Sequence, residues 1–118
     1  MVSIDVSRLM GLERCELVLQ SGLSYDGIRR VRICATKREG RFEFSDGGGA
    51  VAAAGVDPER LDFPNRIAIE EYAVNVSRQG VVWLPGFARS EQQWLAKLPG
   101  LVAAGSLALY EALLELGE

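Results

Sequence analysis

The sequence predicts an α+β fold in which an antiparallel sheet, a three-stranded meander plus a hairpin, packs on helices that include a long C-terminal one. Residues 14–45 contain three segments whose apolar side chains alternate with polar ones, and turn sequences separate these segments. Residues 74–85 show the pattern of a hairpin. From residue 90 onward, apolar side chains recur at the three- and four-residue spacing of a helix.

The meander follows a short N-terminal helix that Asp5 can cap. Its first strand is the alternating segment CELVLQSGL, and SYDG at residues 24–27 supplies a hairpin turn. The second strand, IRRVRICATK, is expected to turn one set of residues toward the core: Ile28, Val31, Ile33 and Ala35. The third strand, RFEF, returns with Phe42 and Phe44 facing the same way.

The segment after the meander predicts a small helix over AVAAAG, ended by Gly55. Residues 65–73 fit either a helix or a strand. Pro64 beside Asn65 favours a helix start, so we expect a helix there. The next segment, VNVSRQGVVWLP, indicates a hairpin with SRQG as its turn, and its second strand is expected to stop at Pro85.

The C-terminal helix begins with a capping box, formed by Ser90 and Gln93. Pro99-Gly100 interrupts the helical pattern, so we expect a kink or two helices. A second apolar stripe widens the apolar surface beyond what one sheet face must cover; it consists of Leu95, Leu107, Tyr110 and Leu114. This excess predicts that the helix contacts a second copy of the chain, as in a homodimer.

Composition sets the class of protein. The 118 residues predict a single domain, 1–118, and 48% hydrophobic with 25% charged residues is ordinary for a soluble globular protein. No apolar run reaches the ~20 residues of a membrane span, and no signal-peptide pattern opens the chain. We therefore expect a cytoplasmic protein without a membrane partner. Its two cysteines, Cys15 and Cys34, are expected to be free thiols.

The chain contains no histidine. This removes the commonest metal ligand, the commonest general base, and every Ser-His or Cys-His nucleophile arrangement. We expect no metal site and no cofactor. An enzyme built on this sequence would have to rely on carboxylates, lysine, tyrosine or a hydrated hard cation.

The stretch FEFSDGGGAVAAAG, residues 42–55, places three glycines between a strand and a small helix. It is not a phosphate-binding loop of the Walker type, because that motif requires a lysine and then a serine or threonine after the glycines, and neither follows here. The favoured interpretation is a strand-to-helix corner in which Asp46 accepts hydrogen bonds from the following amides. The alternative is that Asp46 is an acid/base or metal-binding group, with Glu43 and Asp26 as partners.

The sequence Phe44-Ser45-Asp46-Gly47-Gly48, preceded by YDGIRRVRICATKREG, resembles a bacterial family described only as a domain of unknown function. In that family a strand ends in [LFY]-[ST]-D-[DG]-G. The resemblance follows the order of elements over about residues 3–112. The chain departs from it in GGAVAAAG, where larger apolar residues are expected. The resemblance implies no established activity.

Residues 29–41, RRVRICATKREGR, carry six basic side chains and one acidic one within a chain of net charge −3. Arginines at alternate strand positions would line the outer face of the sheet. The candidates for binding a polyanion are Arg30, Arg32, Lys37 and Arg41. The favoured interpretation, however, is a solvated face paired with acids such as Glu16 and Glu43, and an acidic protein partner is a further alternative.

The function favoured by the sequence is a non-enzymatic bacterial binding or regulatory module that self-associates through its C-terminal helix. Its ligand would be a protein or a polyanion at the arginine-rich face. One alternative is a nucleic-acid binder that uses the four basic residues. The other is a carboxylate-based, metal-dependent hydrolase centred on Asp46.

Overall fold

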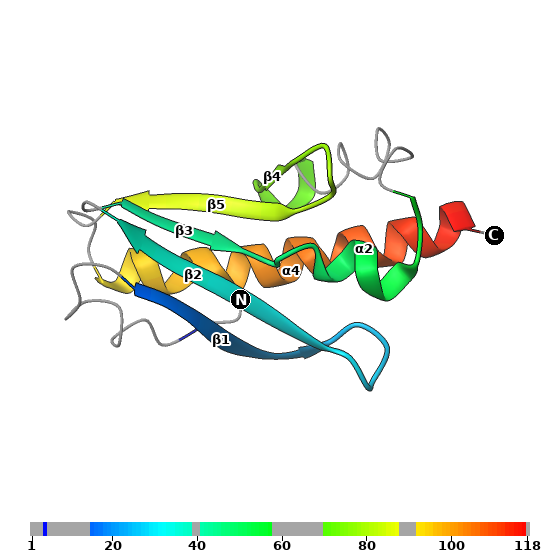
Figure 1. Ribbon diagram of the computed structural model, residues 1–118, viewed down its shortest axis with the longest axis horizontal. Coiled ribbons are helices and arrows are strands. Elements are labelled where there is room, and N and C mark those ends of the chain that lie inside the picture. The colour runs from blue at the N-terminus through cyan, green and yellow to red at the C-terminus, as the bar shows by residue number, and fades with distance from the viewer. Residues whose placement is uncertain (1–3, 5–14, 39–40, 58–69, 88–91, 118) are drawn as a thin grey trace.

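The computed structural model describes residues 4, 15–38, 41–57, 70–87 and 92–117 (Figure 1). Within these residues, five strands form one antiparallel sheet in the order β1-β2-β3-β5-β4. The strands are β1 (Cys15–Ser24), β2 (Arg30–Arg38), β3 (Arg41–Ser45), β4 (Asn75–Val76) and β5 (Val82–Phe87). Two helices, α2 (Gly49–Ala54) and α4 (Gln92–Gly117), lie on one face of it. The predicted fold class, a meander plus a hairpin packed on helices, is confirmed.

The sheet has a covered face and an open face. Val31, Ile33 and Ala35 of β2 are fully buried under the helices, and Ala35 pairs with the buried Phe44 of β3, as the alternation predicts. Ile28 does not join this row. β2 begins only at Arg30, so Ile28 lies in the β1–β2 loop with 86% of its surface exposed.

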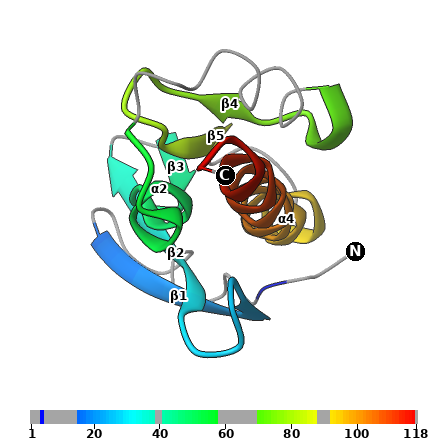
Figure 2. The same ribbon diagram turned by 90° about the vertical axis from the view of Figure 1, so that its right-hand side faces the viewer.

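α4 runs behind the sheet along the long axis of the molecule, and α2 packs beside it (Figures 1 and 2). α4 is a single helix that includes Pro99, so the expectation of two helices is not met. Two residues of the predicted second stripe, Leu95 and Tyr110, lie in the core. Leu107 is half-buried, and Leu114 is exposed. Most of the apolar surface expected to contact a second copy is therefore used inside the chain.

By length and hydropathy, the stretch Leu95–Glu115 of α4 meets the requirements of a membrane span, although no span was expected from the sequence. In its most apolar window, however, 61% of the residues are buried inside the chain. Core helices of soluble proteins share this composition.

The hairpin of β4 and β5 turns at residues 77–80, where Ser77 and Val81 pair and Gly80 has a φ of 81°. β5 does not stop at Pro85 but continues to Phe87. Pro85 is tolerated because β4 pairs only with Val82 and Trp83, so β5 has no β4 neighbour at residue 85.

Residues 70–72 are helical, in agreement with the helix expected over 65–73. The remainder of that helix at 65–69, the N-terminal helix after Asp5 and the capping residue Ser90 lie outside the described residues.

The relative lengths of β2 and β3 determine where a site can form. β3 ends at Ser45, which pairs with Cys34, so residues 30–33 of β2 have no partner in β3. The chain turns away at this point into α2, which packs on α4 and also contacts β2. The result is a space at the end of the sheet, bordered by β2, α2 and the β1–β2 loop.

Candidate functional site

Asp46 lies at the corner between β3 and α2, and only 5% of its surface is exposed. Its Oδ1 atom accepts hydrogen bonds from the backbone N–H groups of Gly48 (2.9 Å) and Val82 (3.0 Å). Its own N–H donates to the Val82 carbonyl at 2.9 Å. Gly47 and Gly48 have φ values of 62° and 78°, which turn the chain back toward the carboxylate. One side chain therefore fixes the start of α2 beside β5.

The second carboxylate oxygen connects this corner to α4. Ser106 is fully buried and donates to Oδ2 of Asp46 at 2.6 Å. The Oγ atom of Ser106 also lies 2.6 Å from the hydroxyl oxygen of Tyr25. Because the single proton of Ser106 goes to the carboxylate, Tyr25 is the donor in this second bond. The Tyr25–Ser106–Asp46 hydrogen-bond chain thus joins the β1–β2 loop, α4 and the corner.

Burial is the main cause of the shifted pKa values in this hydrogen-bond chain. It raises the pKa of Asp46, and the hydrogen bonds from Ser106 and the backbone offset only part of the effect. None of the described residues supplies a cation to this carboxylate. Burial also raises the pKa of Tyr25 to about 12, with the charge of Asp46 adding to the increase and the Ser106 hydrogen bond opposing it. Both groups therefore favour their neutral forms more than they would in water.

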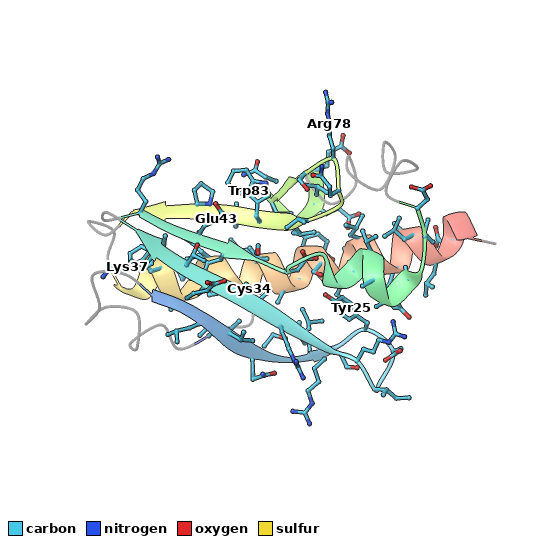
Figure 3. All side chains as sticks on the ribbon, in the orientation of Figure 1. Tyr25, Cys34, Lys37, Glu43, Arg78 and Trp83 are labelled. Atoms are coloured by element: carbon cyan, nitrogen blue, oxygen red, sulfur yellow. The ribbon has the colours of Figure 1, made fainter. Side chains whose placement is uncertain are left out.

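The three carboxylates proposed as catalytic candidates lie in different environments. Asp46 is in the interior, whereas Glu43 is exposed in the middle of β3 on the open face (Figure 3). Asp26 is exposed in the β1–β2 loop, where hydrogen bonds from the N–H groups of Arg29 and Ile28 lower its pKa. Among the described residues, no three His, Cys, Asp or Glu side chains are placed to hold a metal ion. In this arrangement Asp46 connects elements of the fold.

Cys34 is a free thiol on β2, directly beside the Asp46 corner. A Cβ atom on Gly47 would lie 3.3 Å from its sulfur. Partial burial raises the pKa of the thiol, and the charges of Asp46 and Glu16 add to the increase. The environment of Cys34 is therefore that of an unreactive thiol.

A hollow of about 410 Å³ occupies the space between the β1–β2 loop and α2, and we call it the arginine hollow. Its wall includes Arg29, Arg30, Arg32, Tyr25, Gly49 and Ala52. The guanidinium of Arg29 donates to the carbonyl of Ala52 at 3.1 Å, which holds it against α2. Arg30 and Arg32 are exposed and form no ion pair with another described residue. Three positive charges thus surround a space that no described acid fills.

A second hollow of about 380 Å³ lies on the other side of the loop and is lined by Leu23, Ser24 and Gly27. Ile28 and Arg30 line both hollows. The boundary shared by the two hollows thus includes an apolar residue and a cationic one.

The four basic residues predicted to bind a polyanion do not share one surface. Arg30 and Arg32 lie at the arginine hollow, but Lys37 lies at the other end of β2 (Figure 3). Lys37 is only 9% exposed, and its Nζ lies 5.1 Å from the centre of the Phe42 ring. Lys37 is an odd number of positions from Arg32, which places it on the covered face, away from Arg30 and Arg32. Arg41 is exposed at the start of β3, opposite Arg38.

Sequence reasoning missed three residues of these sites: Tyr25, Arg29 and Ser106. For Ser106 a signal was present, because it is the only polar side chain between Leu98 and Leu109. A lone hydroxyl in an apolar helix is expected to have a partner. Nothing in the sequence identified Asp46 as that partner.

Scans against protein-family models, curated proteins and solved structures found no match to this chain. The resemblance of residues 44–48 to a bacterial domain family therefore stays a prediction.

Proposed function

We propose that this chain is a non-enzymatic binding module and that its arginine hollow receives an anionic group of the ligand. One observation carries the proposal: Arg29, Arg30 and Arg32 all line a single hollow, and Arg30 and Arg32 have no acidic partner among the described residues. Arginine presents its N–H groups as a planar fork that matches a carboxylate or a phosphate.

A binding role is favoured over a catalytic one by the surroundings of Asp46, the only buried carboxylate among the described residues. The contacts of Asp46 are with Ser106, Gly48 and Val82, all of them inside the fold. Tyr25, which separates the arginine hollow from this carboxylate, is itself 9% exposed and engaged with Ser106. A ligand in the hollow would meet guanidinium groups and apolar side chains rather than an acid/base pair.

The test is a titration of the ¹⁵N-labelled chain with sodium sulfate, followed by NMR and compared with sodium chloride at matched ionic strength. We expect saturable shifts at the amides of residues 28–32 and 49–53. The variant R30A/R32A should lose them. R78A is the matched control, because Arg78 is an exposed arginine that projects from the β4–β5 turn (Figure 3).

Shifts that are absent, spread over the whole chain, or unchanged in R30A/R32A would contradict the proposal. A fluorescent single-stranded oligonucleotide serves as a second probe in the same variants. Binding that falls steeply with salt and disappears in R30A/R32A would assign nucleic acid as the ligand. We expect weak binding of this probe, because Tyr25, the aromatic residue of the hollow, is too buried to stack on bases.

A further inference from the structure

We infer that the arginine hollow receives the acidic end of α4 from a second copy of this chain, an inference that rests on the proposed function above. The contributing residues of α4 are Glu111, Leu114 and Glu115. All three are exposed, and 42% of the Leu114 surface is accessible. Their spacing of three and four residues places them on one side of the helix. We call this surface the acidic patch.

The two surfaces complement each other in charge and in apolar character. The acidic patch surrounds one exposed leucine with two carboxylates, and the rim of the arginine hollow surrounds the exposed Ile28 with three guanidinium groups. Among the described residues, the exposed large hydrophobic side chains are Val18, Ile28 and Leu114. Two of the three therefore lie in these two surfaces, where docking would remove them from water.

No described residue of the same chain neutralises either surface. Arg30 and Arg32 form no ion pair with another described residue, and the same holds for Glu111 and Glu115. Charges of both signs are thus presented to solvent on one molecule without contacting each other. Opposite charges in such an arrangement favour association between copies and set its orientation.

The positions of the arginine hollow and the acidic patch on the molecule allow two copies to form a closed dimer. The β1–β2 loop and the C-terminal end of α4 both lie toward the same end of the long axis (Figures 1 and 2). Two copies related by a two-fold axis at this end would make the contact twice, each offering its hollow to the patch of the other. An isologous dimer of this kind closes on itself and leaves neither surface unused.

The experiment measures the mass of the full chain by light scattering after size exclusion, using reciprocal charge reversals. R30E/R32E makes the hollow negative, and E111R/E115R makes the patch positive. We expect the wild type to form a dimer that dissociates as salt is added. Each reversal should raise the dimer Kd about tenfold or more, because like charges then face each other. Far-ultraviolet circular dichroism and thermal melts confirm that both variants are folded.

An equimolar mixture of the two variants provides the decisive measurement. The mixture restores opposite charges at both contacts, so a heterodimer should form and be detectable by native mass spectrometry. The control E70R/E71R makes the same charge change at two exposed glutamates outside both surfaces and should dimerise like the wild type. The pair I28S and L114S should weaken the dimer without any change of charge.

Three outcomes would overturn the inference: a wild-type chain that is monomeric at its highest soluble concentration, a dimer unaffected by either reversal, or a mixture that does not associate. Failure of this inference is distinguishable from failure of the proposed function. If sulfate still shifts residues 28–32 in a monomeric chain, the hollow binds anions and its partner is not a second copy. If sulfate binds nowhere, the proposed function itself fails.

Discussion

A Cβ atom on Gly49 would lie 2.6 Å from the hydroxyl oxygen of Tyr25. The same hydroxyl is hydrogen-bonded to Ser106 in the core, so Tyr25 cannot move away without losing that partner. The first residue of α2 is therefore glycine because of what packs on it. Its neighbours Gly47 and Gly48, by contrast, are required by their positive φ values.

The variant G49A should lower the free energy of unfolding by about 1–3 kcal/mol, the usual cost of adding a methyl group to a packed site. In a Y25F background the cost should be smaller by about 1 kcal/mol or more, because the nearest remaining atom of the ring lies 3.4 Å away. Urea unfolding of the four proteins of this double-mutant cycle measures the difference. G55A is the control, since nothing lies within 4 Å of its Cβ, and its cost should be the same in both backgrounds. Additive costs for G49A and Y25F would show that the close approach is not energetically important.

Substitution of Asp46 separates the role of its shape from that of its charge. In D46N the amide oxygen can still accept from Gly48 and Val82, while the amide nitrogen donates to Ser106, whose hydroxyl then donates to Tyr25. We expect D46N to be at least as stable as the wild type at neutral pH, because it removes a buried charge. D46A leaves these donors without an acceptor and should cost about 2–4 kcal/mol. Guanidinium unfolding measures both, and a large loss in D46N would show that the charge itself is needed.

The raised pKa of Asp46 predicts how stability changes with pH. The folded state holds this proton more tightly than the unfolded state does, so the contribution of Asp46 to stability is fully present below its unfolded pKa near 3.8. It is lost as the pH rises through the folded pKa. Other groups nearby, Tyr25 and Cys34, also have raised pKa values and stay protonated over the acidic range. The stability of the wild type relative to D46N should therefore fall between acidic and neutral pH, and a difference that rises with pH would contradict the assignment.

Tyr25 should titrate with a pKa of about 12, compared with 10.0 for an unperturbed tyrosine. Its folded pKa is also raised, so its contribution to stability is complete below pH 10 and is lost as the pH approaches 12. A rapid pH jump followed by tyrosinate absorbance measures the folded titration before unfolding can occur. The step near pH 12 should be missing from Y25F. If Y25F instead lacked a titration step near pH 10, the prediction would be wrong, because the Tyr25 hydroxyl would then be in contact with solvent.

Cys34 should react slowly with thiol reagents, because burial and neighbouring carboxylates disfavour its thiolate. The C15S variant isolates this thiol, and the rate of reaction with Ellman's reagent near neutral pH measures its accessibility. We expect a rate well below that of a free thiol, and recovery of the full rate after unfolding in guanidinium. A fast reaction in the folded state would mean that the corner beside Gly47 opens readily.

Local pattern was enough to predict most of the sheet and part of the corner. Alternation placed Val31, Ile33 and Phe44 in the core, and the glycines after Asp46 indicated a turn capped by its side chain. These features depend on neighbours in sequence. Lys37 shows the limit of such reasoning, because its charge suggested a surface position that its place in the alternation did not allow.

What the sequence could not reveal depends on contacts between distant segments. Ser106 and Asp46 are 60 residues apart, and Tyr25 and Ser106 are 81 apart. No local spacing predicts such pairs. The arginine hollow likewise exists because α2 returns to pack on α4 and leaves the start of β2 uncovered on one side. Arg29 is held at the hollow by a hydrogen bond to the carbonyl of Ala52, a residue that only folding brings near it.

The five residues of β3, against nine in β2, have a consequence for how this site could be gained or lost. Continuing β3 in register by two residues would set them opposite Ile33 and Arg32, where the backbone would occupy the space now bordered by the arginines. The hollow therefore lies where a longer β3 would extend the sheet. An insertion that lengthens β3 would close it even with every arginine retained, so the length of this strand is the first feature to compare in any related chain.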